Sequence, residues 1–200
     1  MEKNEPKRAI TLASRAVEEN PASDEFRHTL GVAYFAQGKL TEARSSLDQA
    51  VQLDPGNAKA HFGLGIVQKA QGEAKTAISS FRSAIRADPK YIEAHSNLGA
   101  LFFHQGQFND AIITFREALR LRPKSDFDGR SDEYVRIQKN LVNTLHAASR
   151  KDNAMGFSYL QLPWLSHSIA YRLGTSDIDV MRQIFFLEQY ACVAQEIEVE

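Results

Sequence analysis

The histidines are the side chains of this sequence best able to hold a metal ion, and their spacing argues against that chemistry. A helical metal site usually pairs two histidines four residues apart. No two of the six histidines have this separation. His61 and His95 instead lie 34 residues apart, one period of the repeat described below, which indicates packing positions. The sequence therefore predicts no metal site.

Other motifs of enzyme chemistry are incomplete. Gly63-x-Gly65 resembles the start of a phosphate-binding loop, but Gln68 stands where the third glycine belongs and the segment lies in a predicted helix. Neither a Gly-x-Ser-x-Gly nucleophile elbow nor a P-loop occurs. Cys192, the one cysteine, lies among apolar residues of a predicted helix, which is typical of a buried small side chain. We therefore expect no catalytic residue and no cofactor in this chain.

The composition is that of an ordinary globular protein. Of the 200 residues, 43% are hydrophobic and 24% are charged. The 24 Lys and Arg nearly balance the 25 Asp and Glu, so no global field attracts nucleic acid or anionic lipid. No stretch reaches the roughly 18 apolar residues of a membrane span, and the N-terminus does not resemble a secretory signal. These features predict a cytoplasmic protein without nucleic acid or membrane contacts.

An internal repeat of 34 residues organises the first two thirds of the chain. Prolines, two sets of alanines and two kinds of glycine-containing pair keep this step. The repeated positions are Pro21, Pro55, Pro89 and Pro123; Ala9, Ala43, Ala77 and Ala111; Ala16, Ala50, Ala84 and Ala118; Leu-Gly at 30–31, 64–65 and 98–99; and Gln-Gly at 37–38, 71–72 and 105–106.

Each period fits two antiparallel helices joined by a short turn. The first helices are predicted at 24–37, 58–71 and 92–105, and the second helices at 41–53, 75–87 and 109–121. A glycine ends each first helix, because glycine adopts positive φ without steric cost. The prolines follow the second helices and stop them.

Small and large residues alternate between the two helices of each unit. Small residues at the Leu-Gly pairs and the alanine positions predict that the helices approach closely there. Leu47, Phe81 and Phe115 share one repeated position and are predicted to fill the space between the helices.

With these positions in view, the chain resembles a tetratricopeptide repeat protein. The match covers three full units, at 24–57, 58–91 and 92–125, and a half unit at 1–23 that corresponds to a second helix alone. The resemblance implies an all-α fold, a right-handed α-solenoid of helix-turn-helix repeats. It also implies that the first helices line a concave groove that binds a peptide or helix of a partner.

Four residues depart from the family pattern. Arg27, His61 and His95 stand where the family often has tryptophan, and Gln68 stands in a position that is otherwise aromatic. We expect looser local packing at these residues.

The resemblance places a mixed set of apolar, amide and charged residues on the groove. This set predicts a protein-protein interaction scaffold that holds an extended or helical peptide. The lysines, asparagines and arginine with which related domains clamp a chaperone C-terminus do not stand at the matching positions, so a chaperone tail is not the expected ligand. The predicted groove residues are His28, Thr29, Val32, Phe35, Lys59, Phe62, Ile66, Lys69, Ser96, Asn97, Phe103 and His104.

After Pro123 the period breaks. A polar loop precedes a predicted helix at about 132–148, and residues 126–161 are expected to form a degenerate fourth helical unit that caps the array. Residues 162–200 are expected to form a helical extension whose helix at 177–195 is apolar on more than one face. Burial of that helix requires docking on the solenoid or self-association through 178–194.

The extension also resembles the lead-in to the S-adenosylmethionine-binding domain of FkbM-type methyltransferases. The shared residues are 174–177 (Gly-Thr-Ser-Asp), 182–185 (Arg-Gln-Ile-Phe) and Tyr190. This resemblance implies an alternative function, the substrate-recruiting part of a methyltransferase that ends before its catalytic domain. The half unit at the start and the apolar helix at the end fit a piece of a longer protein.

Overall fold

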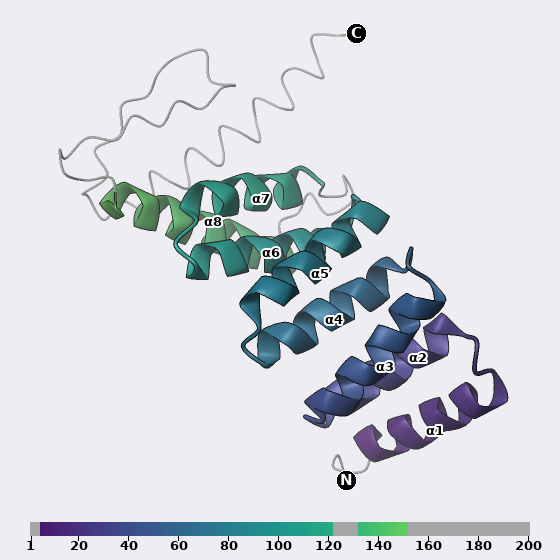
Figure 1. The fold of residues 1–200 in the computed structure, drawn as a ribbon. Helices are drawn as coiled ribbons and strands as arrows, with labels where there is room; N and C mark the ends of the chain where they lie inside the picture. The colour runs from purple at the N-terminus through teal and green to yellow at the C-terminus, as the bar shows by residue number, and fades with distance from the viewer. Residues whose placement is uncertain (1–4, 122–131, 152–200) are drawn as a thin grey trace, which may run out of the picture. The chain divides into compact units, whose positions relative to one another are not determined.

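The fold is all α-helical in the part of the chain that the structure describes. The structure is a computed structural model that describes residues 5–121 and 132–151 (Figure 1). The helices in these ranges are α1 Glu5–Glu19, α2 Asp24–Ala36, α3 Leu40–Leu53, α4 Ala58–Ala70, α5 Ala74–Ala87, α6 Ile92–His104, α7 Phe108–Arg120 and α8 Asp132–Lys151. None of them is long and apolar enough to cross a membrane.

The helix pairs follow the predicted period. The first helices of the three full repeats are α2, α4 and α6, the second helices are α3, α5 and α7, and every boundary lies within one residue of its prediction. The half unit supplies α1, and the predicted helix after the loop is α8. The predicted extension at 162–200 lies outside the described residues.

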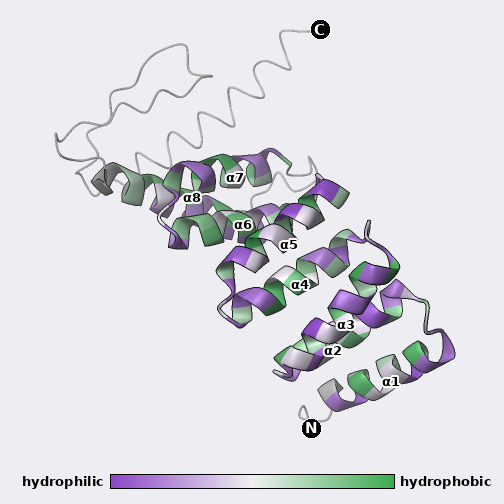
Figure 2. Cartoon of the chain, in the orientation of Figure 1, coloured by the Kyte–Doolittle hydropathy of each residue, from purple (hydrophilic) through white to green (hydrophobic). Residues whose placement is uncertain are grey.

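Contacts between helices follow chain order, as in a solenoid. The chain divides into two units between Leu141 and Val142, within α8. In the first unit each helix from α1 to α7 packs against the next, and α2 also packs against α4, the first helix of the following repeat (Figure 1). In the second unit, Thr144 and Leu145 of α8 are buried. Figure 2 shows that hydrophobic and hydrophilic residues mix along the helices, as expected when each helix has a buried and a solvated side.

Glycines end the first helices as predicted. Gly38, Gly72 and Gly106 have φ angles of 73°, 80° and 71°. At the first of these turns the Gly38 N–H donates to the Phe35 carbonyl at 2.8 Å, and the Lys39 N–H donates to the Tyr34 carbonyl at 3.0 Å. This pattern satisfies carbonyls that would otherwise lack partners at the helix end.

Each repeat seats one large side chain of its second helix on a glycine of its first helix. A Cβ added to Gly65 would lie 2.7 Å from the Phe81 ring, and one added to Gly99 would lie 2.8 Å from the Phe115 ring. The closest atom to a Cβ at Gly31 would be Leu47 Cγ, at 2.6 Å. Glycine is therefore required at these positions because a large side chain of the second helix rests directly on them. This refines the prediction of a close approach between the helices.

The residues at the family's tryptophan position form hydrogen bonds to the segments that connect one repeat to the next. His61 Nε2 donates to the Pro55 carbonyl at 2.9 Å, and His95 Nε2 donates to the Pro89 carbonyl at 3.0 Å. Arg27 Nε donates to the Pro21 carbonyl at 3.3 Å. A hydrogen bond to the preceding proline thus recurs at this position, where the sequence indicated packing alone.

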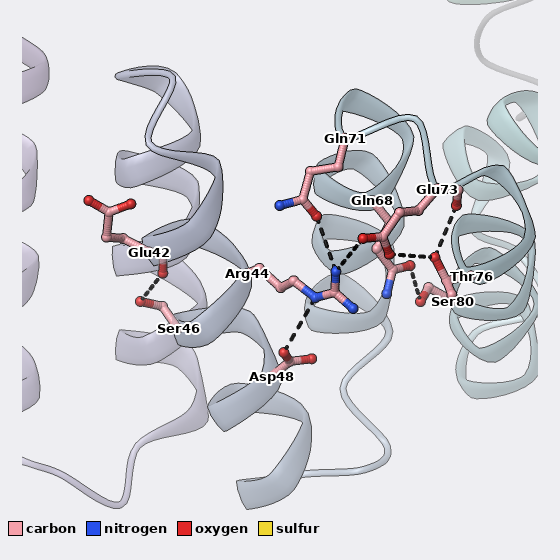
Figure 3. Close-up of polar contacts among 9 residues, drawn as sticks. All are labelled: Glu42, Arg44, Ser46, Asp48, Gln68, Gln71, Glu73, Thr76 and Ser80. Carbon is pink, nitrogen blue, oxygen red and sulfur yellow. Dashed lines mark hydrogen bonds and ion pairs between the residues drawn. The ribbon is translucent and has the colours of Figure 1, made fainter.

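Gln68 is buried and paired rather than loosely packed. Its side chain is 6% exposed, and its Oε1 accepts a hydrogen bond from Ser80 Oγ at 2.7 Å (Figure 3). A buried amide costs free energy unless it is hydrogen-bonded. The partner serine on α5 therefore compensates for the loss of the aromatic residue.

We predict that the effects of substituting Gly99 and Phe115 on the free energy of unfolding are coupled, because the Phe115 ring rests directly on Gly99. Gly99→Ala should destabilise the chain by about 1–3 kcal/mol, because the new methyl group collides with the ring. In the background of Phe115→Ala the same substitution should cost nothing or stabilise, since the space is open and alanine favours helix. Urea unfolding of the four chains of this cycle measures the difference. Equal costs of Gly99→Ala in both backgrounds would show that the ring does not press on the glycine.

Candidate functional site

The first helices carry a continuous outer surface, which we call the first-helix face and define by the predicted groove residues of α2, α4 and α6. These residues recur at helical spacing, while Leu30, Gly31 and Ala33 on the other side of α2 are buried. On the face itself, Val32 is 46% exposed. Thr29, Lys59, Lys69 and His104 are also exposed, and His28, Phe35, Phe62, Ile66, Asn97 and Phe103 are half-buried.

Ser96 differs from the other predicted residues. It is 3% exposed, so its hydroxyl presents almost no surface to a ligand. We therefore leave Ser96 out of the proposed binding surface.

Side chains join neighbouring helices across the face. His28 of α2 lies over Gly63 of α4, where an added Cβ would be 3.8 Å from His28 Cδ2. Between α4 and α6, the Lys69 ammonium donates to Asn97 Oδ1 at 2.6 Å. The three first helices therefore present one surface rather than three separate ones.

Asn97 is the best-oriented polar group on the face. Its Oδ1 accepts from Lys69, and its Nδ2 donates to the Glu93 carbonyl at 2.9 Å. A side-chain amide has two acceptor lone pairs and two donor hydrogens. Asn97 therefore keeps one acceptor site and one donor for a ligand, and its two internal bonds hold both in place.

Phe62 belongs to the face and to the core. Its ring centroid lies 5.6 Å from that of Phe81, which is fully buried, and 4.9 Å from that of Tyr91. Burial raises the pKa of the Tyr91 phenol to about 12. Removal of Phe62 would therefore disturb packing as well as any binding, and it is a poor probe of the face.

Phe103 lies where the face meets α7. Its ring centroid lies 5.9 Å from that of Phe108, the first residue of α7, and 5.6 Å from that of His104. The face therefore ends in a small aromatic group beside the turn from α6 to α7.

The cations of the face lie in partly dehydrated surroundings. Burial lowers the pKa of His28, and the nearby Lys59 ammonium lowers it further against the opposing charges of Asp24 and Glu25. Burial also lowers the pKa of Lys69, with a further contribution from Arg136 of α8. Arg136 was not among the predicted residues, because it belongs to α8, outside the first helices of the three full repeats.

The described residues contain no cluster of three or more His, Cys, Asp or Glu side chains that could hold a metal ion. Cys192 and the methyltransferase-like residues at 174–190 lie outside the described ranges. The chemistry available on the first-helix face is hydrogen bonding, apolar contact and charge pairing.

Family models identify these repeats. A tetratricopeptide repeat model matches residues 1–50, a TPR repeat model matches residues 31–72, and a second tetratricopeptide repeat model matches residues 62–126. Since the three matches together span residues 1–126, the chain belongs to the tetratricopeptide repeat proteins. No curated protein matches the sequence significantly.

Solved structures share the fold at low sequence identity. The crystal structure of MamA is 23% identical with a TM-score of 0.56, and the match covers 75% of this chain and 92% of that one. The first TPR of Spaghetti (RPAP3) bound to the HSP90 peptide SRMEEVD is 21% identical with a TM-score of 0.56, and the match covers 64% of this chain and 94% of that one. These likenesses confirm the helical-repeat fold.

We predict that His28 makes the stability of the chain sensitive to acid. Because its pKa is lowered from the usual 6.5, the unfolded chain binds this proton more readily than the folded chain. The free energy of unfolding should therefore fall as the pH drops below about 6.5. His28→Gln should reduce this loss when the free energy of unfolding in urea is compared between one pH above and one pH below that value. His104→Gln, at an exposed histidine of the same face, is the control. An equal reduction by both substitutions would contradict the prediction.

Proposed function

We propose that the chain is a protein-protein interaction scaffold whose first-helix face binds a peptide segment of a partner. The observation that carries the proposal is the Lys69–Asn97 pair, which links α4 to α6 and holds an amide with a free donor and acceptor at the surface. Extended peptides expose both kinds of group along their backbone.

Apolar residues of the first-helix face supply the other half of the interaction. Val32 of α2 is exposed although the opposite side of its helix packs in the core. Ile66, one turn before Lys69, is half-buried on the same face. Burial of such residues by a ligand contributes roughly 25 cal/mol per Å² of apolar surface. A peptide with alternating apolar side chains would place them against these residues while its backbone meets Asn97.

Membership of the tetratricopeptide repeat proteins agrees with this proposal. One protein with the same fold, the first TPR of Spaghetti, is bound to an HSP90 peptide. In this chain, however, the residues expected of a chaperone-tail clamp are missing from the matching positions. We therefore propose an internal peptide segment as the ligand rather than a chaperone C-terminus.

We predict that peptides selected on the full chain from a random library bind through Asn97 and Val32. Asn97→Ala removes the amide and Val32→Glu places a charge among the apolar contacts, so each should weaken binding by about tenfold or more. Fluorescence anisotropy with a labelled selected peptide measures the change.

A matched control for this prediction is available on α1. Leu12 is 67% exposed and lies outside the first-helix face, so Leu12→Glu makes a similar apolar-to-acidic change elsewhere. It should leave binding unchanged. Selected peptides that bind the Asn97 and Val32 variants as tightly as the original chain would contradict the proposed function.

A further inference from the structure

A concave surface lies on the second helices, lined by residues other than those of the first-helix face. A cleft of about 600 Å³ is lined by α5 and α7, with His95 and Leu98 of α6 at its base. Both α5 and α7 pack against α6. His95 and Leu98 are themselves buried, so the base of the cleft is part of the solenoid core. We call this the α5–α7 cleft.

The walls of the cleft are apolar. Ile78 and Ile85 of α5 lie on one side, and Ile113 of α7 lies on the other. Ile113 is 66% exposed, and Ile78 and Ile85 are half-buried. The three isoleucines give a partner an apolar stripe to cover.

The same cleft is strongly basic. Lys75, Arg82 and Arg86 line it from α5, and within residues 5–121 and 132–151 none of the three forms an ion pair. The one carboxylate in the lining, Glu117, accepts from Arg120 Nε at 2.8 Å and from Arg120 Nη2 at 2.6 Å. Its charge is therefore already balanced, and the three cations leave a net positive surface.

One repeat earlier, the corresponding positions have a different character. Arg44, Asp48 and Ser79 stand where the cleft has Ile78, Arg82 and Ile113. Arg44 Nη1 donates to Glu73 Oε1 at 2.8 Å and to Gln71 Oε1 at 3.3 Å, and its Nε lies 3.9 Å from Asp48 Oδ2 (Figure 3). There the charged groups satisfy one another within the chain.

The preceding repeat folds with an arginine at the position of Ile78 and an aspartate at the position of Arg82, so the repeat fold requires neither residue. Contiguous apolar residues that face solvent mark an interaction surface, and cations beside them favour an acidic partner. Their concentration on one surface indicates a binding site.

We infer that the α5–α7 cleft binds an acidic amphipathic helix of a partner protein. The lining residues of α5 from Lys75 to Arg86 extend over about 16 Å, or three helical turns. An apolar stripe on the ligand would meet the isoleucines, and its glutamates or aspartates would meet the cations on the flank. No Phe, Tyr or Trp is among the described residues that line the cleft, so it lacks the stacking surface typical of single-stranded nucleic acid sites.

The cleft is independent of the proposed peptide site. Its walls come from α5 and α7, whereas the first-helix face lies on α2, α4 and α6. A scaffold built this way can hold two different segments at once.

A designed peptide tests the inference on the full chain. The probe is a labelled peptide of about 18 residues, or five helical turns, with leucines at i, i+3, i+4 and i+7 and glutamates on the other side. It should bind, and binding should weaken with added salt. A peptide with lysines in place of the glutamates should not bind. The double variant Lys75→Glu with Arg86→Glu should weaken binding of the acidic peptide by about tenfold or more. The single variant Ile113→Glu should weaken it to a similar extent.

Lys59→Glu provides the control, because it reverses a positive charge on the first-helix face and should leave binding of this peptide unaffected. Circular dichroism and the melting curve of each variant establish that it folds. The inference fails if the acidic peptide does not bind, if the basic peptide binds equally well, or if the cleft variants bind like the original chain. It also fails if a single-stranded oligothymidine displaces the peptide at equal concentration, since the site would then recognise polyanions generally.

Discussion

The contact on which the rest of the structure depends is the one between a large side chain of each second helix and a glycine of the first. Leu47, Phe81 and Phe115 are almost fully buried, and each lies where any side chain on Gly31, Gly65 or Gly99 would collide with it. This contact fixes the distance between the helices of a repeat and their rotation about their own axes. Once the rotation is fixed, the remaining sides of the helices face outward in the same way in every repeat. Binding surfaces can then vary in sequence without loss of the fold.

Residues that differ between repeats at the same repeated position give each repeat a different surface. The position of Thr29 and Asn97 is glycine in the middle repeat, and there His28 lies over Gly63. The position of Ile78 is Arg44 one repeat earlier, and there it carries an internal ion pair. Even the position that is often tryptophan in the family is used differently, as Arg27, His61 and His95 each bind the carbonyl of a preceding proline. Each of these differences changes a surface or a link and leaves the seating of the large side chain intact.

The sequence was sufficient for the fold, whereas the groove residues stay a prediction. Glycines with positive φ, prolines after helices and the 34-residue step are local signals, so the helices of the three full repeats could be predicted to within a residue. Side-chain pairing between repeats is not local. The burial of Ser96, the sharing of Phe62 between face and core, and the Gln68–Ser80 bond depend on how helices distant by a dozen or more residues meet. The α5–α7 cleft was missed for the same reason, although the change from Ser79 to Ile113 at one repeated position was a visible signal.

We propose that one solenoid presents two separate binding surfaces. Isoleucine methyl groups report on both, because Ile66 lies on the first-helix face and Ile78 and Ile113 line the α5–α7 cleft. The most direct measurement is an isoleucine-methyl NMR titration of the full chain with a library-selected peptide and, separately, with the acidic helical peptide. The selected peptide should shift the Ile66 signal and leave Ile113 unchanged, and the acidic peptide should shift Ile78 and Ile113 and leave Ile66 unchanged. Both peptides shifting the same methyl groups, or neither shifting any, would contradict the account.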